Sequence, residues 1–122
     1  MNIISVNELV NYLKNIVEND PPLQNILVKG EISNYRKVDG HCYCTLKDDF
    51  AVIECVIFSR VNENLDFNLG EGMVVMVRGS IEVYRKRGSF QLIAEEISLS
   101  GKGELYARFL KLKEKLQNEG LF

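Results

Sequence analysis

The sequence predicts a mainly β protein, a small closed barrel of five strands with flanking helices. Five short β-type runs lie between residues 27 and 99, and turn residues separate them. Amphipathic helical periodicity lies at the two ends of the chain. With 122 residues, of which 46% are hydrophobic and 26% charged, the chain has the size and composition of one compact domain with a buried core.

The first element is an amphipathic helix that runs to about Glu18. Ser5 and Glu8 are the residue types of a capping box, in which two orphan N–H groups are satisfied reciprocally. The segment 20–22 ends the helix, because proline lacks an N–H donor and disfavours the α region for the residue before it. The apolar residues recur at helical spacing and are Val6, Leu9, Val10, Leu13, Ile16 and Val17.

The first strand is expected over residues 26–35, and Gly30 within it marks a bulge or sharp bend. After a turn at 39–40, a second strand places Cys42, Cys44 and Leu46 inward, with alternate residues outward. A third strand over 51–58 continues the same inward parity. The outward residues of the second strand are His41, Tyr43, Thr45 and Lys47.

Residues 59–72 are polar, with room for a short helix around 61–65 that would plug the barrel. The fourth strand, 73–84, has Gly79 as a second bend and places Arg78 and Tyr84 outward. A basic hairpin loop over 85–88 leads to the fifth strand. That strand runs from Ser89 to about Leu99, and the inward residues of the fourth are Val75, Val77, Gly79, Ile81 and Val83.

The segment 101–103 separates the fifth strand from a last amphipathic helix over Glu104 to about Asn118. The apolar end of the chain at 121–122 indicates a cut inside a longer protein. We therefore expect three parts: an N-terminal helix and linker packed on the barrel (1–25), the barrel (26–100), and a C-terminal helix leading toward a further domain (101–122). The apolar stripe of the last helix is Leu105, Phe109, Leu112 and Leu116.

This order of elements predicts a Greek-key OB-fold, a barrel that usually binds single-stranded nucleic acid or sugar on strands two and three. The loops on either side of that face, between strands one and two and strands four and five, are both basic here. Aromatic rings can stack on bases while arginines and lysines hold phosphates, so single strands are favoured and sequence preference should be weak. The predicted nucleic-acid-binding residues are Lys29, Tyr35, Arg36, Lys37, His41, Tyr43, Lys47, Phe58, Arg78, Tyr84, Arg85, Lys86 and Arg87.

Charge and cysteine content narrow the class of protein. The net charge of −2 excludes a global basic field, so any nucleic-acid site must be a local patch. No apolar run is long enough for a membrane span and the N-terminus lacks signal-peptide features, so a cytoplasmic protein is expected. The odd set of three cysteines fits reduced, buried thiols better than disulfides.

Catalytic and metal chemistry find little support in these residues. Because side chains alternate between the two faces of a strand, His41 should lie on the opposite face of the sheet from the cysteines, which argues against a zinc site. The sequence has no glycine-rich phosphate cradle, and the acidic pairs 48–49 and 95–96 fit turns and surfaces better than a two-metal centre. We expect a non-catalytic segment with no cofactor.

Short stretches in a characteristic order run through nearly the whole chain. They are Ser5-Val6-Asn7-Glu8-Leu9, Val28-Lys29-Gly30-Glu31-Ile32-Ser33-Asn34, Gly40-His41 followed by Tyr43, Thr45, Leu46, Lys47 and Asp48, Val77-Arg78-Gly79, Gln91-Leu92, and Leu112-Lys113-Glu114-Lys115-Leu116 through Glu119-Gly120-Leu121-Phe122. In this order and spacing they resemble the N-terminal domain of the large subunit of exodeoxyribonuclease VII.

The resemblance implies a single-stranded DNA-binding domain of a nuclease that digests single-stranded DNA from both 5′ and 3′ ends, first into large and then into small oligonucleotides. It also implies that the catalytic domain lies beyond Phe122, as do the regions that join several small helical subunits in the cytoplasm. This segment would then bind and deliver DNA. The resemblance leaves the divalent-metal requirement of the full enzyme open. Glu54 departs from the expected pattern, since it places an acid on the predicted DNA face.

Two other functions remain open from the residues alone. The barrel could serve as a protein-interaction scaffold through its apolar outer face and last helix, and that helix could also mediate self-association. Alternatively, it could be an anticodon-type domain that binds structured RNA. At the residue level, Tyr43 and Phe58 could simply cover the sheet, Tyr35 and Tyr84 could pack on the first helix, and the 85–87 loop could be a solubilising tip.

Overall fold

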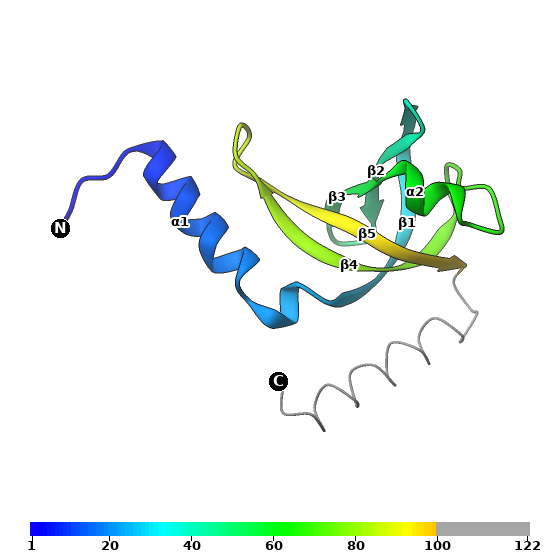
Figure 1. Ribbon diagram of the computed structural model, residues 1–122, viewed down its shortest axis with the longest axis horizontal. Helices are drawn as coiled ribbons and strands as arrows, with labels where there is room; N and C mark the ends of the chain where they lie inside the picture. Colours follow the sequence, from blue (N-terminus) through cyan, green and yellow to red (C-terminus); the bar gives the residue numbers. More distant parts are fainter. Residues whose placement is uncertain (100–122) are drawn as a thin grey trace, which may run out of the picture.

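The computed structural model describes residues 1–99 and contains the predicted five-stranded closed barrel (Figure 1). The strands lie in the order β1-β2-β3-β5-β4, and β4 pairs with β1 to close the ring. Neighbouring strands are antiparallel except β3 and β5, which pair in parallel over three residues of each strand. The predicted helix over 104–118 lies outside the described residues. The elements are α1 (Val6–Glu18), η1 (Pro21–Leu23), β1 (Ile26–Val38), β2 (His41–Lys47), β3 (Val52–Ile57), α2 (Ser59–Glu63), β4 (Val74–Tyr84) and β5 (Ser89–Leu99).

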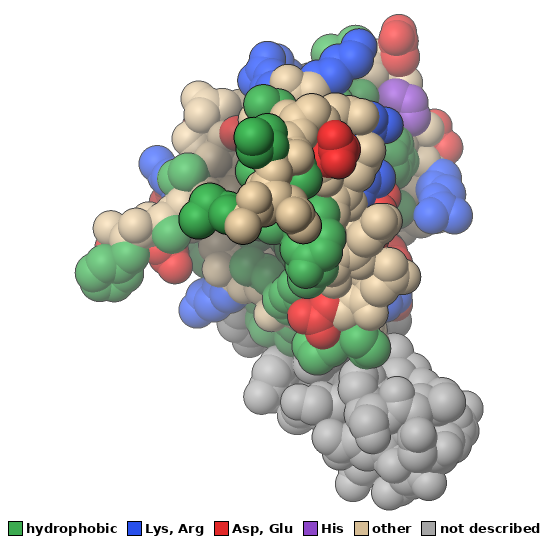
Figure 2. Space-filling model, turned by 90° about the vertical axis from the view of Figure 1, so that its left-hand side faces the viewer, with side chains coloured by type: hydrophobic (Ala, Val, Ile, Leu, Met, Phe, Trp, Pro, Cys, Tyr) green, Lys and Arg blue, Asp and Glu red, His purple; other side chains and the backbone are tan. Residues whose placement is uncertain are grey.

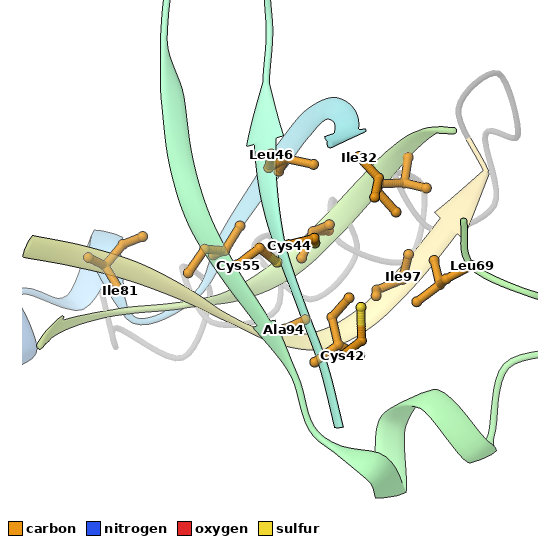
Figure 3. Close-up of a cluster of buried hydrophobic side chains, with 13 residues drawn as sticks. Ile32, Cys42, Cys44, Leu46, Cys55, Leu69, Ile81, Ala94 and Ile97 are labelled. Atoms are coloured by element: carbon orange, nitrogen blue, oxygen red, sulfur yellow. The ribbon is translucent and has the colours of Figure 1, made fainter. Parts of the chain in front are cut away.

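The core fills the inside of the barrel with the inward residues that alternation predicts. Cys42, Cys44 and Leu46 of β2 are at most 3% exposed, and alternate residues of β4 from Val75 to Val83 are buried as well. Figure 3 shows side chains from all five strands converging on this cluster. The segment around α2 closes one end of the barrel, which confirms the predicted plug. Its contributions to the core are Val61, Leu65, Phe67 and Leu69.

The three cysteines are free, buried thiols at the centre of this core. A hydrogen bond with Cys44 and burial raise the pKa of Cys42 far above its usual range. The hydrogen bond with Cys42 favours the thiolate of Cys44. The hydrogen bond with Cys55, together with burial, outweighs it and raises the pKa of Cys44 to about 12. The cysteines therefore act as small apolar core residues.

Gly79 lies at a kink where the pairing of β4 with β5 shifts register. A Cβ atom there would lie 2.0 Å from the carbonyl oxygen of Ile93, so only glycine lets the two backbones approach this closely. The predicted second bend is thus confirmed. Gly30 leaves room for the side chain of Leu46. A Cβ atom at residue 30 would lie 2.7 Å from Leu46 Cγ. The sequence predicted a bulge or a sharp bend at Gly30; the bulge is wrong, because the pairing of β1 with β4 has no register shift there.

The irregularity of β1 lies further along the strand, at Asn34 and Tyr35. The register with β2 shifts between Ser33 and Arg36, and Asn34 has a left-handed φ of 53°. Because the strand pairs with β2 again after the bulge, it continues to Val38 instead of ending at 35.

The N-terminal helix α1 begins with the predicted capping box. The N–H of Glu8 donates to Ser5 Oγ at 3.0 Å, and the N–H of Ser5 donates to Glu8 Oε1 at 3.4 Å. The helix lies beside β4 at its hairpin end (Figure 1). In this part of β4, beyond Gly79, no pairing with β1 is present in the described residues.

Side chains form hydrogen bonds with backbone groups along this unpaired edge of β4. Glu18 Oε2 accepts the backbone N–H of Val83 at 3.2 Å and also binds Lys14 Nζ at 2.6 Å. Gln24 Nε2 donates to the carbonyl oxygens of Ile81 and Val17, each at 3.1 Å. These contacts attach the first helix and η1 to the barrel.

The apolar stripe of α1 is only partly buried. Val10 and Val17 are half-buried against the protein, whereas Leu9, Leu13 and Ile16 are 46%, 42% and 52% exposed. Figure 2, which views the molecule from the side on which α1 lies, shows apolar side chains gathered along this face. The helix is amphipathic as predicted, but in the described residues no element covers its exposed apolar residues Leu9, Leu13 and Ile16. No helix within residues 1–99 is long and apolar enough to span a membrane.

Candidate nucleic-acid interface

A hollow of about 440 Å³, here called the main groove, crosses the outer face of β2, β3, β5 and β4. Four neighbouring strands about 4.8 Å apart make this face about 14 Å across. The groove is lined by Arg36, Tyr43, Glu54, Cys55, Val56, Phe58, Glu82, Tyr84, Arg87, Ser89, Gln91 and Ile93.

Arginines from two distant segments line the main groove. Arg36 comes from β1 just after the bulge, and Arg87 comes from the hairpin between β4 and β5. The bulge decides which side chain faces the groove: Tyr35 packs against the core, and Arg36 lines the groove. Without the extra residue, strand alternation would exchange these two positions.

Glu71 holds the bulge in place. Its carboxylate accepts the backbone N–H groups of Tyr35 at 2.9 Å and Asn34 at 3.1 Å. The hydrogen bond from Tyr35 is the main cause that lowers the pKa of Glu71 below its ordinary value. Burial raises the pKa of the Tyr35 phenol, in keeping with its place against the core.

Aromatic and apolar side chains form the floor of the main groove. Tyr43 is half-buried, Phe58 is 41% exposed, and Val56 between them is 6% exposed. The ring of His41 meets Phe58 edge-on, with 5.5 Å between centroids, and His41 Nδ1 accepts the N–H of Ser59 at 2.9 Å. These contacts hold His41 against Phe58 and the start of α2, and His41 does not line the main groove.

Two carboxylates, Glu54 and Glu82, line the same groove. Glu54 Oε1 accepts a hydrogen bond from the hydroxyl of Thr45 at 3.3 Å. Carboxylates repel phosphates, so they favour a strand whose phosphates lie on the arginine walls and whose bases lie over the floor. They can also accept hydrogen bonds from the exocyclic amino groups of bases.

The structure brings five of the predicted site residues together in the main groove and separates the others. Arg78 lies elsewhere, with side-chain exposure of 18%, and binds Glu95 at 2.9 Å and Glu96 at 3.1 Å. Its intact ion pairs fit a structural role. Lys37 is exposed near the end of β1. The five residues in the groove are Arg36, Tyr43, Phe58, Tyr84 and Arg87.

Lys29 and Lys47 line a separate hollow together with three carboxylates, and Lys47 Nζ lies 3.4 Å from Glu31. Arg85 and Lys86 line a third hollow on the helix side of the hairpin. Sequence reasoning missed several groove residues from β5, because the apolar and acidic residues of that strand do not alternate clearly. These residues are Ser89, Gln91 and Ile93.

Within the described part of the chain, no group of three or more histidine, cysteine, aspartate or glutamate side chains is placed to hold a metal ion. The residues that line the main groove offer rings, cations and hydrogen-bond acceptors. This chemistry suits the binding of a flexible polyanion that carries planar bases.

Residues 4–98 match the family model described as "OB-fold nucleic acid binding domain". Two curated relatives are named "Exodeoxyribonuclease 7 large subunit". The one from Thermoanaerobacter sp. strain X514 is 47% identical over 119 residues, and the one from Clostridium acetobutylicum is 49% identical over 121 residues. Each comparison covers 98% of this chain and 30% of the relative. The chain thus spans about a third of the length of these relatives.

Solved structures with low sequence identity share the fold. Asparaginyl-tRNA synthetase from Pyrococcus horikoshii matches with a TM-score of 0.52 and 18% identity over 66% of this chain and 21% of that one. The Stn1-Ten1 complex of S. pombe matches with a TM-score of 0.52 and 18% identity, over 80% and 74% of the respective chains.

Proposed function

The chain belongs to the family of OB-fold nucleic acid binding domains, and on this premise we propose that it binds single-stranded DNA in the main groove. The observation that carries the proposal is that Arg36 and Arg87 line the same groove as the rings of Tyr43 and Phe58. The two arginines come from segments about fifty residues apart in the sequence. Phosphates would bind these arginines, and bases would stack on the rings without being read.

We further propose that the chain acts within a large subunit of the exodeoxyribonuclease VII type. The support is the similarity of almost the whole chain to proteins with that name. In this proposal the longer protein digests single-stranded DNA from both 5′ and 3′ ends into large and then small oligonucleotides. It would act in the cytoplasm, with small subunits bound through regions beyond Phe122. The domain delivers the strand and performs no chemistry itself.

Titration of a fluorescent oligo-dT at several salt concentrations tests the binding proposal. The logarithm of the association constant should fall linearly with the logarithm of the salt concentration, because each phosphate contact releases counterions. Combining Arg36→Ala with Arg87→Ala should weaken binding and reduce the slope by about 0.7 for each lost contact.

Arg60→Ala is the matched control, because Arg60 is exposed on α2 and lies outside the main groove. It should leave the slope nearly unchanged. Absence of oligo-dT binding at low salt, or an unchanged slope in the double variant, would contradict the proposal. Competition with an RNA hairpin separates the two nucleic acids, since a preference for the hairpin would indicate structured RNA as the ligand.

The exposed stripe of α1 favours protein interaction as a second function of the same domain. Apolar side chains exposed on one helix face are typical of a contact surface. This function is compatible with DNA binding, because the three stripe residues Leu9, Leu13 and Ile16 do not line the main groove. A domain that served only as a scaffold would bind no oligo-dT in the titration above.

A further inference from the structure

The basic hairpin between β4 and β5 divides its cations between two sides. Arg87 lines the main groove, whereas Arg85 and Lys86 line the hollow on the other side, between the hairpin and α1. This second hollow, here called the helix groove, has a volume of about 740 Å³. The hairpin thus contributes cations to both hollows.

The helix groove is itself mainly cationic. Lys14 of α1 lines it together with Arg85 and Lys86, and Glu82 is the one carboxylate among its lining residues within the described chain. Lys14 also binds Glu18 at 2.6 Å, which partly offsets its charge. Three cations against these two carboxylates still favour the binding of phosphates over that of cations.

Hydrogen bonds on both sides hold the helix groove open in a defined shape. Arg85 Nη2 donates to Asn7 Oδ1 at 2.6 Å, which ties the hairpin to the first turns of α1. Glu18 accepts the N–H of Val83 at 3.2 Å near the other end of the helix. The walls are therefore positioned before any ligand arrives, which reduces the entropy cost of binding.

The two grooves adjoin along β4, where they share two lining residues. Tyr84 and Glu82 of β4 line both of them, so a strand that leaves the main groove past Tyr84 meets the helix groove next. We propose that the helix groove is a second subsite for the same single-stranded nucleic acid, in which Lys14 and Lys86 bind the sugar-phosphate backbone independently of base sequence. This inference rests on the proposed function of the main groove.

Binding measurements with oligo-dT of two lengths test the second subsite. A strand of about five nucleotides fills the main groove alone, and one of about fifteen reaches both, within the range of site sizes of OB-folds. Lys86→Gln and Lys14→Gln should each weaken binding of the longer strand and reduce its salt slope by about 0.7, while leaving the shorter strand unaffected. Lys86 is exposed at the hairpin tip, so its substitution does not threaten the fold.

Arg60→Gln controls for the loss of one positive charge, because Arg60 lines neither groove. It should change neither strand's slope by a comparable amount. If both lysine variants affect the two strands equally, or affect neither, the proposal of a second subsite is wrong. The proposal that DNA binds in the main groove is not contradicted by that result. If the unmodified protein binds neither strand, the proposed function itself fails.

Discussion

At the scale of single residues, the bulge of β1 determines what the main groove contains. It directs Arg36 to the groove and Tyr35 to the core, although both residues were expected to contact nucleic acid. Strand periodicity alone could not predict this, because a bulge shifts the parity of every later residue and Asn34 gives only a weak signal for it. Tyr43 and Phe58 were predictable from alternation, since no irregularity interrupts their strands.

Replacement of Gly79 should cost much more stability than replacement of another glycine. Gly79→Ala places a Cβ 2.0 Å from a backbone oxygen of Ile93, which cannot move without breaking the strand pairing. We expect a loss of about 3 kcal/mol or more in the free energy of unfolding, measured by urea denaturation.

Gly70→Ala is the matched control for this substitution. The nearest atom to its added Cβ is Met73 Sδ at 3.9 Å, an ordinary contact, and its φ is not left-handed. Its stability should change by less than about 1 kcal/mol in either direction. Equal effects of the two substitutions would show that the close approach at Gly79 is not a constraint.

Stacking in the main groove depends on the ring of Tyr43 and not on its hydroxyl. Tyr43→Ala should weaken oligo-dT binding by about 1–3 kcal/mol, the usual contribution of one stacked base. Tyr43→Phe should retain most of the affinity, because the ring remains. Fluorescence anisotropy measures both, and a large loss in Tyr43→Phe would instead indicate a hydrogen bond from the hydroxyl.

At the scale of elements, α1 shows what a helical pattern can and cannot predict. The capping box, the apolar spacing and the proline stop gave its bounds from local physics alone. The docking on β4 depends also on polar groups: Glu18, which Lys14 binds, accepts the N–H of Val83 at the unpaired strand edge. Those contacts are non-local, so hydrophobic periodicity alone could not predict which face of the helix contacts the barrel.

The attachment of α1 should weaken in acid because of Glu18. Its hydrogen bond with Lys14 is the main cause that lowers its pKa below the ordinary 4.5. A carboxyl whose pKa is lower in the folded state adds stability that is present above about pH 4.5 and is lost as the pH falls through the folded-state pKa. Glu18→Gln should therefore reduce stability by about 1 kcal/mol at pH 7, and the difference from the unmodified protein should vanish in acid.

Thermal unfolding of the two proteins between pH 3 and pH 7 measures this difference. Glu63→Gln removes an equal charge from an exposed position of α2 and serves as the control. A difference between Glu18→Gln and the unmodified protein that stays constant across this pH range would rule out the ionised carboxylate as its cause.

At the scale of the whole molecule, the closed barrel shields its thiols from reagents. Burial and mutual hydrogen bonds raise the pKa of Cys42 and Cys44, so little thiolate is present at neutral pH even apart from access. We expect Ellman's reagent at pH 8 to label the native protein only as fast as the barrel opens, and to label all three cysteines quickly in denaturant. Rapid labelling of the native protein would mean that the interior is accessible without unfolding.

The parallel seam between β3 and β5 has a consequence for the whole barrel. It joins three residues of each strand, from Glu54 beside Gln91 to Val56 beside Ile93, and parallel pairing is slightly weaker per residue than antiparallel pairing. We therefore expect local opening of the barrel to occur most readily at this seam. Residues from both sides of the seam line the main groove, so a bound DNA strand would contact both β3 and β5 and oppose their separation. Occupancy would then slow amide hydrogen exchange at Leu92, which is buried and does not line the groove.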